Sequence, residues 1–457
     1  MADDDLFDEE YATGVLEEEP AAPAGALRGA LEEQPRTAAP EEPFALRGIV
    51  LTPARRIDGA CVVIDGSTIA AIAEQPPEGV QVIDTGGVIV PGMVDLHGHP
   101  EYNVFAAWEP PRQYTNRHQW RRSKEYAKVV KEPWAELKQI REKLVRYAEA
   151  RSLVGGVTAI QGASRNYVKK EEALVRNIDL RIFGRHRARS IVDLDRVDEP
   201  TRQRIRDQIA SREITAVYVH LAEGIDDASR REFDALVEAN LLTPATVIIH
   251  GTALADEQLA AVRDAGAKLV WSPQSNLRLY GSTTAVARAL ELGVPVALGA
   301  DWLPSGSPSL LAEMRVARRQ LAAQGHPIEA IDLVRMVTRD AAQISGLGDL
   351  LGRLETSRPA DLVVFERNHP DPWESVARSD PSDVELVLIG GNLAYGREDW
   401  IAALTSSGEA EAAVAWGKRV ALDTTYSVAA APSPPPRLAD LRAALLGIYP
   451  QAGPIFG

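Results

Sequence analysis

Short apolar runs alternate with longer amphipathic segments through the middle of the chain, between residues 92 and 348. The runs are rich in Val, Ile and Leu, which is typical of parallel strands buried on both faces. They are Val94–His99, Val157–Ile160, Leu180–Phe183, Ser190–Asp193, Ala216–His220, Thr246–His250, Lys268–Trp271 and Val294–Gly299. The helical segments between them include Trp134–Leu153, Pro200–Ser211, Ala228–Ala239, Ala255–Ala265 and Ala285–Leu292. Because repeated strand–helix units build a parallel sheet, the pattern predicts an α/β fold with a (β/α)8 barrel, distorted near its short fourth strand.

Shorter strands separated by turns flank this region on both sides. Leu46–Leu51, Gly59–Asp65 and Thr68–Ile72 precede it, and Ala360–Phe365 and Val384–Gly391 follow it. The first group is typical of a small antiparallel unit. Such a unit is too small to bury a good core alone. We therefore expect the two flanks, residues 45–91 and 353–400, to join into one composite β-sandwich.

The two ends of the chain differ from the rest in composition. Residues 1–45 contain thirteen acidic residues against two arginines, a net charge of −11 in a chain whose total is −15. Residues 1–44 have few large apolar side chains, so we expect a disordered acidic tail. Residues 401–457 are expected to form an extension with a helical stretch at Glu409–Trp416, a proline-rich linker and a last helix, Leu438–Leu446. This helix docks either on the barrel or on a neighbouring subunit.

Composition narrows the classes of protein to which the chain can belong. No basic stripe or RNA-binding motif is present, which argues against nucleic acid as a partner. No apolar run is long enough to cross a membrane, and the N-terminus lacks a signal-peptide pattern. The single cysteine, Cys61, lies in an apolar run and cannot form a disulfide within the chain. We therefore expect a soluble cytoplasmic protein with no membrane association.

Histidines and one aspartate stand at the ends of several predicted strands. His97 and His99 end the first strand, and His220, His250 and Asp301 end later ones. Side chains at i and i+2 of a strand point to the same side, and the C-terminal ends of barrel strands meet at one face. Four of the eight histidines occupy such positions. This regularity argues against chance, and we interpret the five residues as a metal site.

The residue types at this site indicate its chemistry. Neutral imidazoles with a carboxylate suit zinc or iron(II), and a coordination position left to water makes such a site catalytic. The metal lowers the pKa of the water and produces a nucleophile. A proton must then pass from the water to the leaving group. Glu223, three residues after His220, is placed for this transfer.

Several stretches of the chain, in this order, resemble the amidohydrolase superfamily, in particular its mononuclear deaminases and hydrolytic dehalogenases of nitrogen heterocycles. The stretches are VIVPGMVDLHGHPE, VHLAEG, VIIHGTALADEQLAAVRDAGAKLVWSPQSNLRLYG, VPVALGADWLPSGSPSLLAEM and AAQISGLGDLLGRLETSRPADLVVF. Together they cover roughly residues 46–392. The resemblance implies the composite β-sandwich around a barrel that the flanks already suggest.

The resemblance also implies a role for each residue of the constellation. His97, His99, His220 and Asp301 correspond to metal ligands, and Glu223 corresponds to the proton shuttle. His250 would polarise or orient substrate and water, and Asp301 would also take part in proton transfer. The binuclear members need a carboxylated lysine from the fourth strand, and the stretch from Ile182 to Asp195 contains no lysine. We therefore expect one divalent metal ion, with zinc preferred and iron(II) as the alternative.

The side chains that select the substrate are less clearly marked. The long loop Glu101–Arg122 carries Trp108 and Arg112, and it either covers the site and selects an aromatic or anionic substrate or forms an oligomer contact. Arginine pairs well with carboxylate or phosphate groups of a substrate. The further candidates are Arg165, Arg185, Asn276 and Trp302. We expect a homo-oligomer, specifically a dimer, that acts on a small heterocycle.

The resemblance implies hydrolytic deamination of a nitrogen heterocycle. The first alternative keeps the site but changes the bond, to ring-opening hydrolysis of a cyclic amide or to dehalogenation. The second alternative is a non-catalytic barrel scaffold, against which the intact ligand set and Glu223 argue.

Overall fold

The computed structural model describes residues 40–52, 55–162, 173–179, 188–406, 408, 410–425 and 436–456. Several features expected from the sequence lie outside these residues, in whole or in large part. They are the acidic tail, the strand at Leu180–Phe183, the cationic candidates Arg165 and Arg185, and the proline-rich linker. No helix in the described part of the chain is long and apolar enough to cross a membrane.

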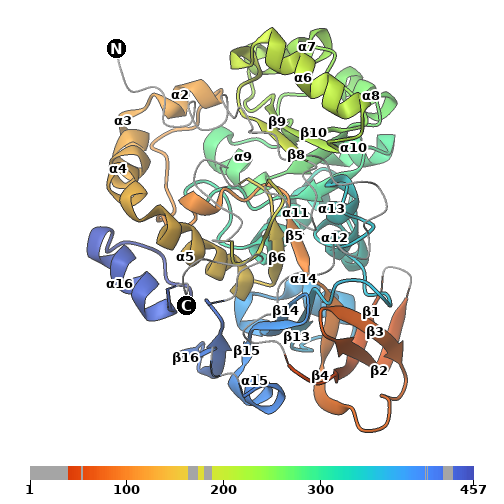
Figure 1. Ribbon diagram of the computed structural model, residues 1–457. Coiled ribbons are helices and arrows are strands. Elements are labelled where there is room, and N and C mark those ends of the chain that lie inside the picture. Colours follow the sequence, from red (N-terminus) through yellow and green to blue (C-terminus); the bar gives the residue numbers. More distant parts are fainter. Residues whose placement is uncertain are drawn as a thin grey trace.

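The centre of the molecule is a barrel of parallel strands arranged in two arcs (Figure 1). One arc has the order β5-β6-β7 and the other β12-β11-β10-β9-β8, so eight barrel strands lie in the described residues. Their bounds are β5 Met93–Asp95, β6 Val157–Ile160, β7 Arg176–Asn177, β8 Ala188–Ile191, β9 Ala216–Leu221, β10 Thr246–His250, β11 Lys268–Trp271 and β12 Val296–Leu298. The predicted barrel is thus confirmed.

Two seams join the arcs. At the first, the amide of Asp301, just after β12, donates to the carbonyl of His97, just after β5, at 2.6 Å. At the second, Gln161 Nε2 donates to Ser190 Oγ of β8 at 3.0 Å. The first seam therefore brings together the ends of β5 and β12, two of the strands that carry predicted site residues.

The third barrel strand includes two residues that the hydrophobic pattern did not select. These residues, Arg176–Asn177, pair with β6. The strand predicted at Leu180–Phe183 lies outside the described residues. Arg176 is fully buried and forms an ion pair with Asp361 at 2.6 Å. A search for apolar runs cannot detect a strand whose buried side chain is charged and paired. The fourth strand, β8, is short as expected and begins two residues earlier than predicted.

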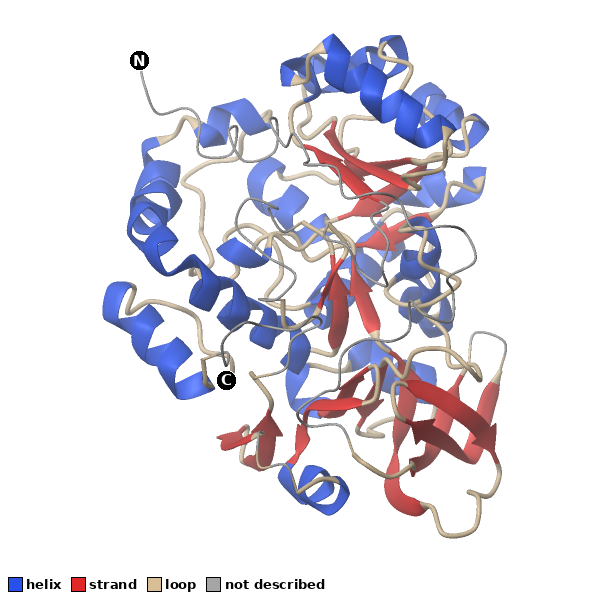
Figure 2. Ribbon diagram, viewed as in Figure 1, coloured by secondary structure: helices blue, strands red, loops and turns tan. Residues whose placement is uncertain are grey.

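Helices cover the outside of the barrel strands (Figure 2). They are α5 Arg141–Val154, α6 Glu199–Ala210, α7 Asp227–Glu238, α8 Asp256–Asp264, α9 Pro273–Tyr280, α10 Val286–Leu292, α11 Leu310–Ala323, α12 Ala330–Met336 and α13 Arg339–Ile344. Several of these helices have a side chain that caps the N-terminus. Asp226 accepts a hydrogen bond from the backbone N–H of Ser229 at α7, and Ser309 accepts one from the backbone N–H of Ala312 at α11. Helices α6, α7, α8 and α10 lie within one residue of their predicted bounds.

The two flanks form one nine-stranded sheet beside the barrel, with the order β16-β17-β15-β14-β13-β4-β1-β2-β3. Its strands are β1 Phe44–Leu51, β2 Arg56–Asp65, β3 Thr68–Ala73, β4 Gln81–Pro91, β13 Leu362–Phe365, β14 Val384–Ile389, β15 Asn392–Arg397, β16 Glu411–Ala415 and β17 Lys418–Leu422. Antiparallel pairing of β4 with β13 joins the N-terminal and C-terminal parts. Phe44 and Leu46 share a core with Leu362 and Leu386, so the composite β-domain is present. The short helices here are α14 Pro372–Arg378, α15 Glu398–Leu404 and the 3-10 turn η6 Pro381–Asp383.

Two details of this sheet differ from the expectation. The N-terminal unit is not wholly antiparallel, because β4 crosses back and pairs in parallel with β1. The stretch predicted as a helix at Glu409–Trp416 is instead strand β16, in a hairpin with β17. Alanine-rich composition favoured a helix, but Trp416 and Gly417 have left-handed backbone angles, as tight hairpin turns require. The turn thus overrides the helix propensity.

The barrel is tied to its surroundings at two places. Arg176 of the three-strand arc pairs with Asp361, whose Oδ1 also accepts the amide of Gly390 at 2.6 Å in the nine-stranded sheet. On the other side, the last helix, α16 Leu438–Ile448, packs on α5. Leu441 and Leu445 are buried there, so this helix docks on the barrel of its own chain.

Candidate active site

Five side chains gather at the C-terminal ends of the barrel strands. His97 and His99 follow β5, His220 lies in β9, His250 ends β10 and Asp301 follows β12. Each is at most 7% exposed. Their donor atoms fall into two overlapping groups, one of His97, His99 and His220 and the other of His97, His250 and Asp301, with the atoms of each group within 4.8 Å of one another. The fold thus brings together all five residues that the strand-end pattern selected.

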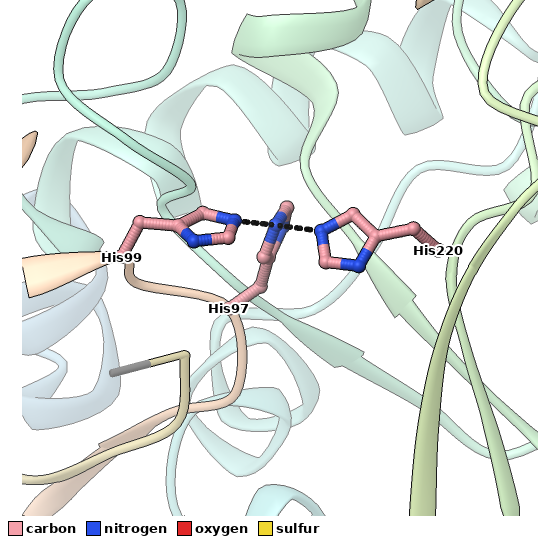
Figure 3. Close-up of side chains that lie close together, drawn as sticks. All are labelled: His97, His99 and His220. Atoms are coloured by element: carbon pink, nitrogen blue, oxygen red, sulfur yellow. Dashed lines mark hydrogen bonds between the residues drawn. The ribbon is translucent and has the colours of Figure 1, made fainter. Parts of the chain in front are cut away.

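The three imidazoles of the first group point their Nε2 atoms at one another, with His97 between the other two (Figure 3). The Nε2 of His97 lies 3.0 Å from that of His99 and 3.1 Å from that of His220. Two nitrogens bound to one zinc ion at about 2.0–2.1 Å in tetrahedral geometry would lie about 3.3–3.4 Å apart. The observed spacing is close to what ligands of a single ion require.

Asp301 completes the group from the far end of the five-strand arc. Its Oδ1 lies 3.3 Å from His97 Nε2 and 3.8 Å from His99 Nε2. Its backbone amide donates to the His97 carbonyl, so both the side chain and the main chain of Asp301 face the same histidine. The carboxylate therefore meets the imidazoles at the first seam of the barrel.

The backbone at the site adopts conformations that side chains other than glycine rarely take. His99, His250 and Asp301 have φ angles of 38°, 68° and 59°. Each lies where a strand turns into a loop, and the left-handed turn directs the side chain back over the strand ends. Such strain costs on the order of 1–3 kcal/mol per residue and is concentrated at functional sites.

A second layer of side chains orients these groups. His97 Nδ1 lies 2.9 Å from Ser272 Oγ, which directs the opposite nitrogen, Nε2, toward the other imidazoles. Asp95 Oδ1 accepts the amides of His97 at 3.1 Å and Ala300 at 3.2 Å, so one carboxylate spans the first seam. Asn276 Oδ1 lies 3.0 Å from His250 Nδ1. Asn276, which the sequence suggested for substrate contact, is therefore placed to fix the orientation of His250.

Burial sets the charge state of the site. It lowers the pKa of His97 and His220 well below the usual histidine value and that of His99 to about 3, and the neighbouring imidazoles act in the same direction. Burial also raises the pKa of Asp301 to about 6, which leaves the carboxylate ionised at neutral pH. Neutral imidazoles with one carboxylate are the donor set that zinc and iron(II) prefer. The residues present therefore fit a divalent metal ion.

Glu223 lies beside this group, just after β9, and is buried. Its Oε2 is 3.7 Å from His250 Nε2, and its Oε1 accepts a hydrogen bond from the hydroxyl of Tyr280 at 2.7 Å. Ala222, next to it, has a φ of 53°, which turns the chain so that Glu223 faces the histidines again. The Glu223 carboxyl, which is suited to general acid–base chemistry, thus lies near the four residues His97, His99, His220 and Asp301, here called the metal-binding group.

Residues 100–131, here called the cap segment, lie across the ends of the strands. They contain η2 Pro100–Tyr102, α2 Arg117–Arg121, α3 Lys124–Tyr126 and the π-helical turn η3 Ala127–Lys131, and they continue into α4 Glu132–Leu137 and η4 Lys138–Ile140. Main-chain hydrogen bonds join Trp108 to Pro304, Tyr114 to Leu279 and Thr115 to Ile225. The loop expected after the first strand therefore covers the loops that follow β9, β11 and β12.

The substrate candidates occupy different environments. Trp108 is buried within the cap segment, and its ring lies 6.2 Å from that of Tyr114. Arg112 is exposed, with its guanidinium 5.2 Å from the Tyr114 ring centroid, and it is not brought to the histidines. Trp302 is buried beside Asp301, and its ring centroid lies 5.5 Å from that of Trp120. Trp302 is thus the aromatic candidate closest to the metal-binding group along the chain.

Sequence reasoning missed three residues of the site: Asp95, Ser272 and Tyr280. Asp95 stands two residues before His97, so the strand alternation that paired His97 with His99 also pointed to it. Ser272 directly follows an apolar run, as the histidines do. Tyr280 left no such signal, because its position at the end of helix α9 predicts burial and nothing about Glu223.

Comparisons with known proteins show which family this chain resembles. The sequence profile of the Amidohydrolase family matches residues 201–394. A 5-methylthioadenosine/S-adenosylhomocysteine deaminase of Syntrophobacter fumaroxidans is 26% identical over 76% of this chain and 91% of its own. One of Teredinibacter turnerae is 32% identical over 34% of this chain, and that alignment spans only 38% of the relative's length.

Solved structures share the fold. An adenosine deaminase from Xanthomonas campestris with bound zinc matches 79% of this chain and 96% of its own, at a TM-score of 0.61 and 16% identity. An atrazine chlorohydrolase from Arthrobacter aurescens, complexed with zinc, matches 79% of this chain and 98% of its own, at a TM-score of 0.62 and 18% identity. These folds are barrels of the kind described above. The chain is thus similar in sequence to the Amidohydrolase family over residues 201–394, and it shares its fold with these solved structures.

Proposed function

We propose that this protein is a mononuclear metal-dependent aminohydrolase that removes ammonia from an amino-substituted nitrogen heterocycle. The observation that carries the proposal is the convergence of three imidazole Nε2 atoms and the Asp301 carboxylate beside a buried Glu223. His97, His99, His220 and Asp301 would hold the metal, with zinc as the first choice. A bound divalent ion would supply positive charge that lowers the pKa of a water and polarises the substrate.

The chain's own residues would move the protons. The reaction breaks the bond between a ring carbon and an amino group, forms a C–O bond with water, and involves no oxidation or reduction. Glu223 would accept a proton from the attacking water and deliver one to the leaving nitrogen, which departs as ammonia. Asp301, ionised at neutral pH, would take part as a second acceptor.

His250 would orient the substrate and water. Its Nδ1 faces Asn276 Oδ1, an acceptor, so this nitrogen carries a hydrogen and Nε2 is directed toward Glu223 and the metal-binding group. Trp302 would supply an apolar wall for a planar ring, because it directly follows Asp301 in the sequence and its side chain is buried. The buried setting of all these groups would exclude bulk water and strengthen their electrostatic effects.

The relatives narrow the first substrate to test. Two of them are named for the deamination of 5-methylthioadenosine and S-adenosylhomocysteine, and both compounds carry the amino group of adenine. The chlorohydrolase among the structural neighbours motivates the alternative, displacement of halide at the same site. We therefore propose adenine nucleosides first and halogenated or amino-substituted triazines second. We also propose that the protein forms a homodimer.

The test joins metal analysis to product detection. Purified protein is incubated with purines, pyrimidines, triazines and cyclic amides, and ammonia, chloride and ring opening are measured separately. Ammonia release from at least one compound is expected. Chloride release or ring opening without ammonia would favour the alternative chemistry, and no turnover of any compound by protein that contains metal would overturn the enzyme assignment.

A second experiment replaces Glu223, the proposed proton shuttle. Glu223→Gln keeps the shape but cannot act as a base, so we expect turnover to fall by about 10²- to 10⁴-fold with metal content unchanged. Glu257→Gln, an exposed position on α8, is the control and should behave as the wild type. Full activity in Glu223→Gln would contradict the assigned role.

A further inference from the structure

Three buried groups form a hydrogen-bonded chain that ends at Glu223. The indole Nε1 of Trp120 donates to the hydroxyl of Tyr280 at 2.9 Å, and that hydroxyl donates to Glu223 Oε1 at 2.7 Å. The three residues come from the cap segment, from helix α9 and from the turn after β9. Their exposed fractions are 3%, 2% and 4%. These hydrogen bonds therefore connect three separate parts of the barrel mouth away from solvent.

The donor and acceptor properties of the three groups determine the direction of these hydrogen bonds. An indole N–H can only donate, so the Tyr280 oxygen must accept from Trp120. The Tyr280 hydroxyl then has one hydrogen left, and it points to Glu223. Burial, together with the negative charge of Glu223, raises the pKa of Tyr280 well above its usual value, so the hydroxyl keeps its hydrogen. Tyr280 is thus a permanent donor to one carboxylate oxygen.

The two oxygens of Glu223 are consequently not equivalent. Oε1 is held by Tyr280, whereas Oε2 lies 3.7 Å from His250 Nε2, too far for a hydrogen bond, on the side of the metal-binding group. A carboxylate on a flexible side chain would otherwise exchange its oxygens by rotation. The hydrogen bond from Tyr280 opposes that rotation and leaves Oε2 toward the reacting groups.

We propose that Tyr280 is a positioning residue for the proton shuttle: it anchors Oε1 of Glu223 so that protons are exchanged at Oε2, and Trp120 of the cap segment fixes the direction of its hydroxyl. This inference rests on the proposed function, because it assigns a role relative to proton transfer by Glu223. It also gives the cap segment a part in catalysis, since the segment supplies the first donor of the chain.

The test compares Tyr280→Phe with the wild type in steady-state kinetics on the compound that releases ammonia. A hydrogen bond to a charged group, when lost, reduces kcat by about 10- to 100-fold. KM should change by less than about 2-fold, because Tyr280 does not touch the substrate. Metal content should stay at the wild-type value. Trp120→Phe should lower kcat in the same direction by a smaller factor.

Two controls separate positioning from a structural role. Tyr114→Phe removes another buried hydroxyl near helix α9, one that has no hydrogen-bond partner in the described residues, and should leave kcat unchanged. In the Glu223→Gln background, Tyr280→Phe should cause no further loss of residual turnover, because its partner no longer acts as a base. A merely structural role would instead multiply the two losses.

The outcomes are distinct. An active wild type with an equally active Tyr280→Phe variant overturns the positioning role and leaves the proposed function standing. A variant that loses metal or changes only KM also overturns it. A wild type that contains metal and releases no ammonia from any compound overturns both proposals.

Discussion

The two arcs of the barrel reach the same site by different routes. In the five-strand arc each strand pairs in regular parallel register with the next, and this arc supplies His220, His250, Asp301 and Glu223. The three-strand arc has short strands and a long excursion through the cap segment between β5 and β6, and it supplies His97 and His99. The regular arc carries most of the proposed catalytic residues. The site is nevertheless completed only where the arcs meet.

The seam between the arcs is therefore part of the site. The amide of Asp301 bonds to the carbonyl of His97, and Asp95 accepts the amides of His97 and Ala300. These contacts hold the proposed ligands of different arcs at a fixed separation. Residues outside the proposed ligand set, such as Asp95, can therefore decide whether the proposed ligands converge.

The largest expected effect is the loss of a ligand from either arc. His99→Ala in the three-strand arc and His220→Ala in the five-strand arc should abolish bound metal and turnover to the same extent, because both imidazoles face His97 Nε2 within 3.1 Å. His326→Ala, at a half-buried position outside the site, is the control. Metal retained at the wild-type level in one of the two variants would show that the replaced histidine is not a ligand.

A change at the seam should have an intermediate effect. A Cβ added at Gly299 would lie 2.4 Å from the His97 Cβ and 2.8 Å from the His97 nitrogen, so Gly299→Ala must push His97 away. We expect metal affinity to fall by about 10- to 100-fold, as for other changes that disturb ligand orientation. Gly447→Ala, where an added Cβ meets open space, is the control. Unchanged affinity in Gly299→Ala, measured by competition with a chelator, would argue against the seam.

The smallest expected effect on the chemistry comes from the outer anchor of the three-strand arc. Arg176→Ala leaves Asp361 buried without its ion pair, which should destabilise the fold by about 3–5 kcal/mol in denaturant titration. The metal-binding residues do not touch this pair, so kcat of the folded fraction should stay near the wild-type value. Arg335→Ala, on an exposed ion pair with Asp332, should cost less than about 1 kcal/mol. Equal costs for the two variants would contradict the anchoring role of Arg176.

The arcs also differ in how far the sequence predicts them. Apolar periodicity placed β9 to β12 and their helices closely, because these strands are apolar on both faces and end at marked residues such as His220 and His250. The same reasoning missed β7, whose buried Arg176 is satisfied only by Asp361, a residue far away in the chain. Pairing across such a distance leaves no local pattern.

The candidate site shows the same division. Residues with a recognisable chemistry at a strand end, such as His97 and Asp301, could be selected from the sequence. Tyr280 could not, because its value lies in a contact with Glu223 that depends on how helix α9 and the turn after β9 pack. The parallel pairing of β1 with β4 and the strand at β16 were missed for a related reason: crossovers and turns decide them, and composition does not.

Titration of metal-free protein with zinc, followed by calorimetry, tests the central claim most directly. If ligands from both arcs converge on one ion, the wild type should bind one zinc per chain with an affinity that neither His99→Ala nor His220→Ala retains. Binding of two ions, or tight binding of one ion that survives either substitution, would contradict a single metal site shared between the arcs.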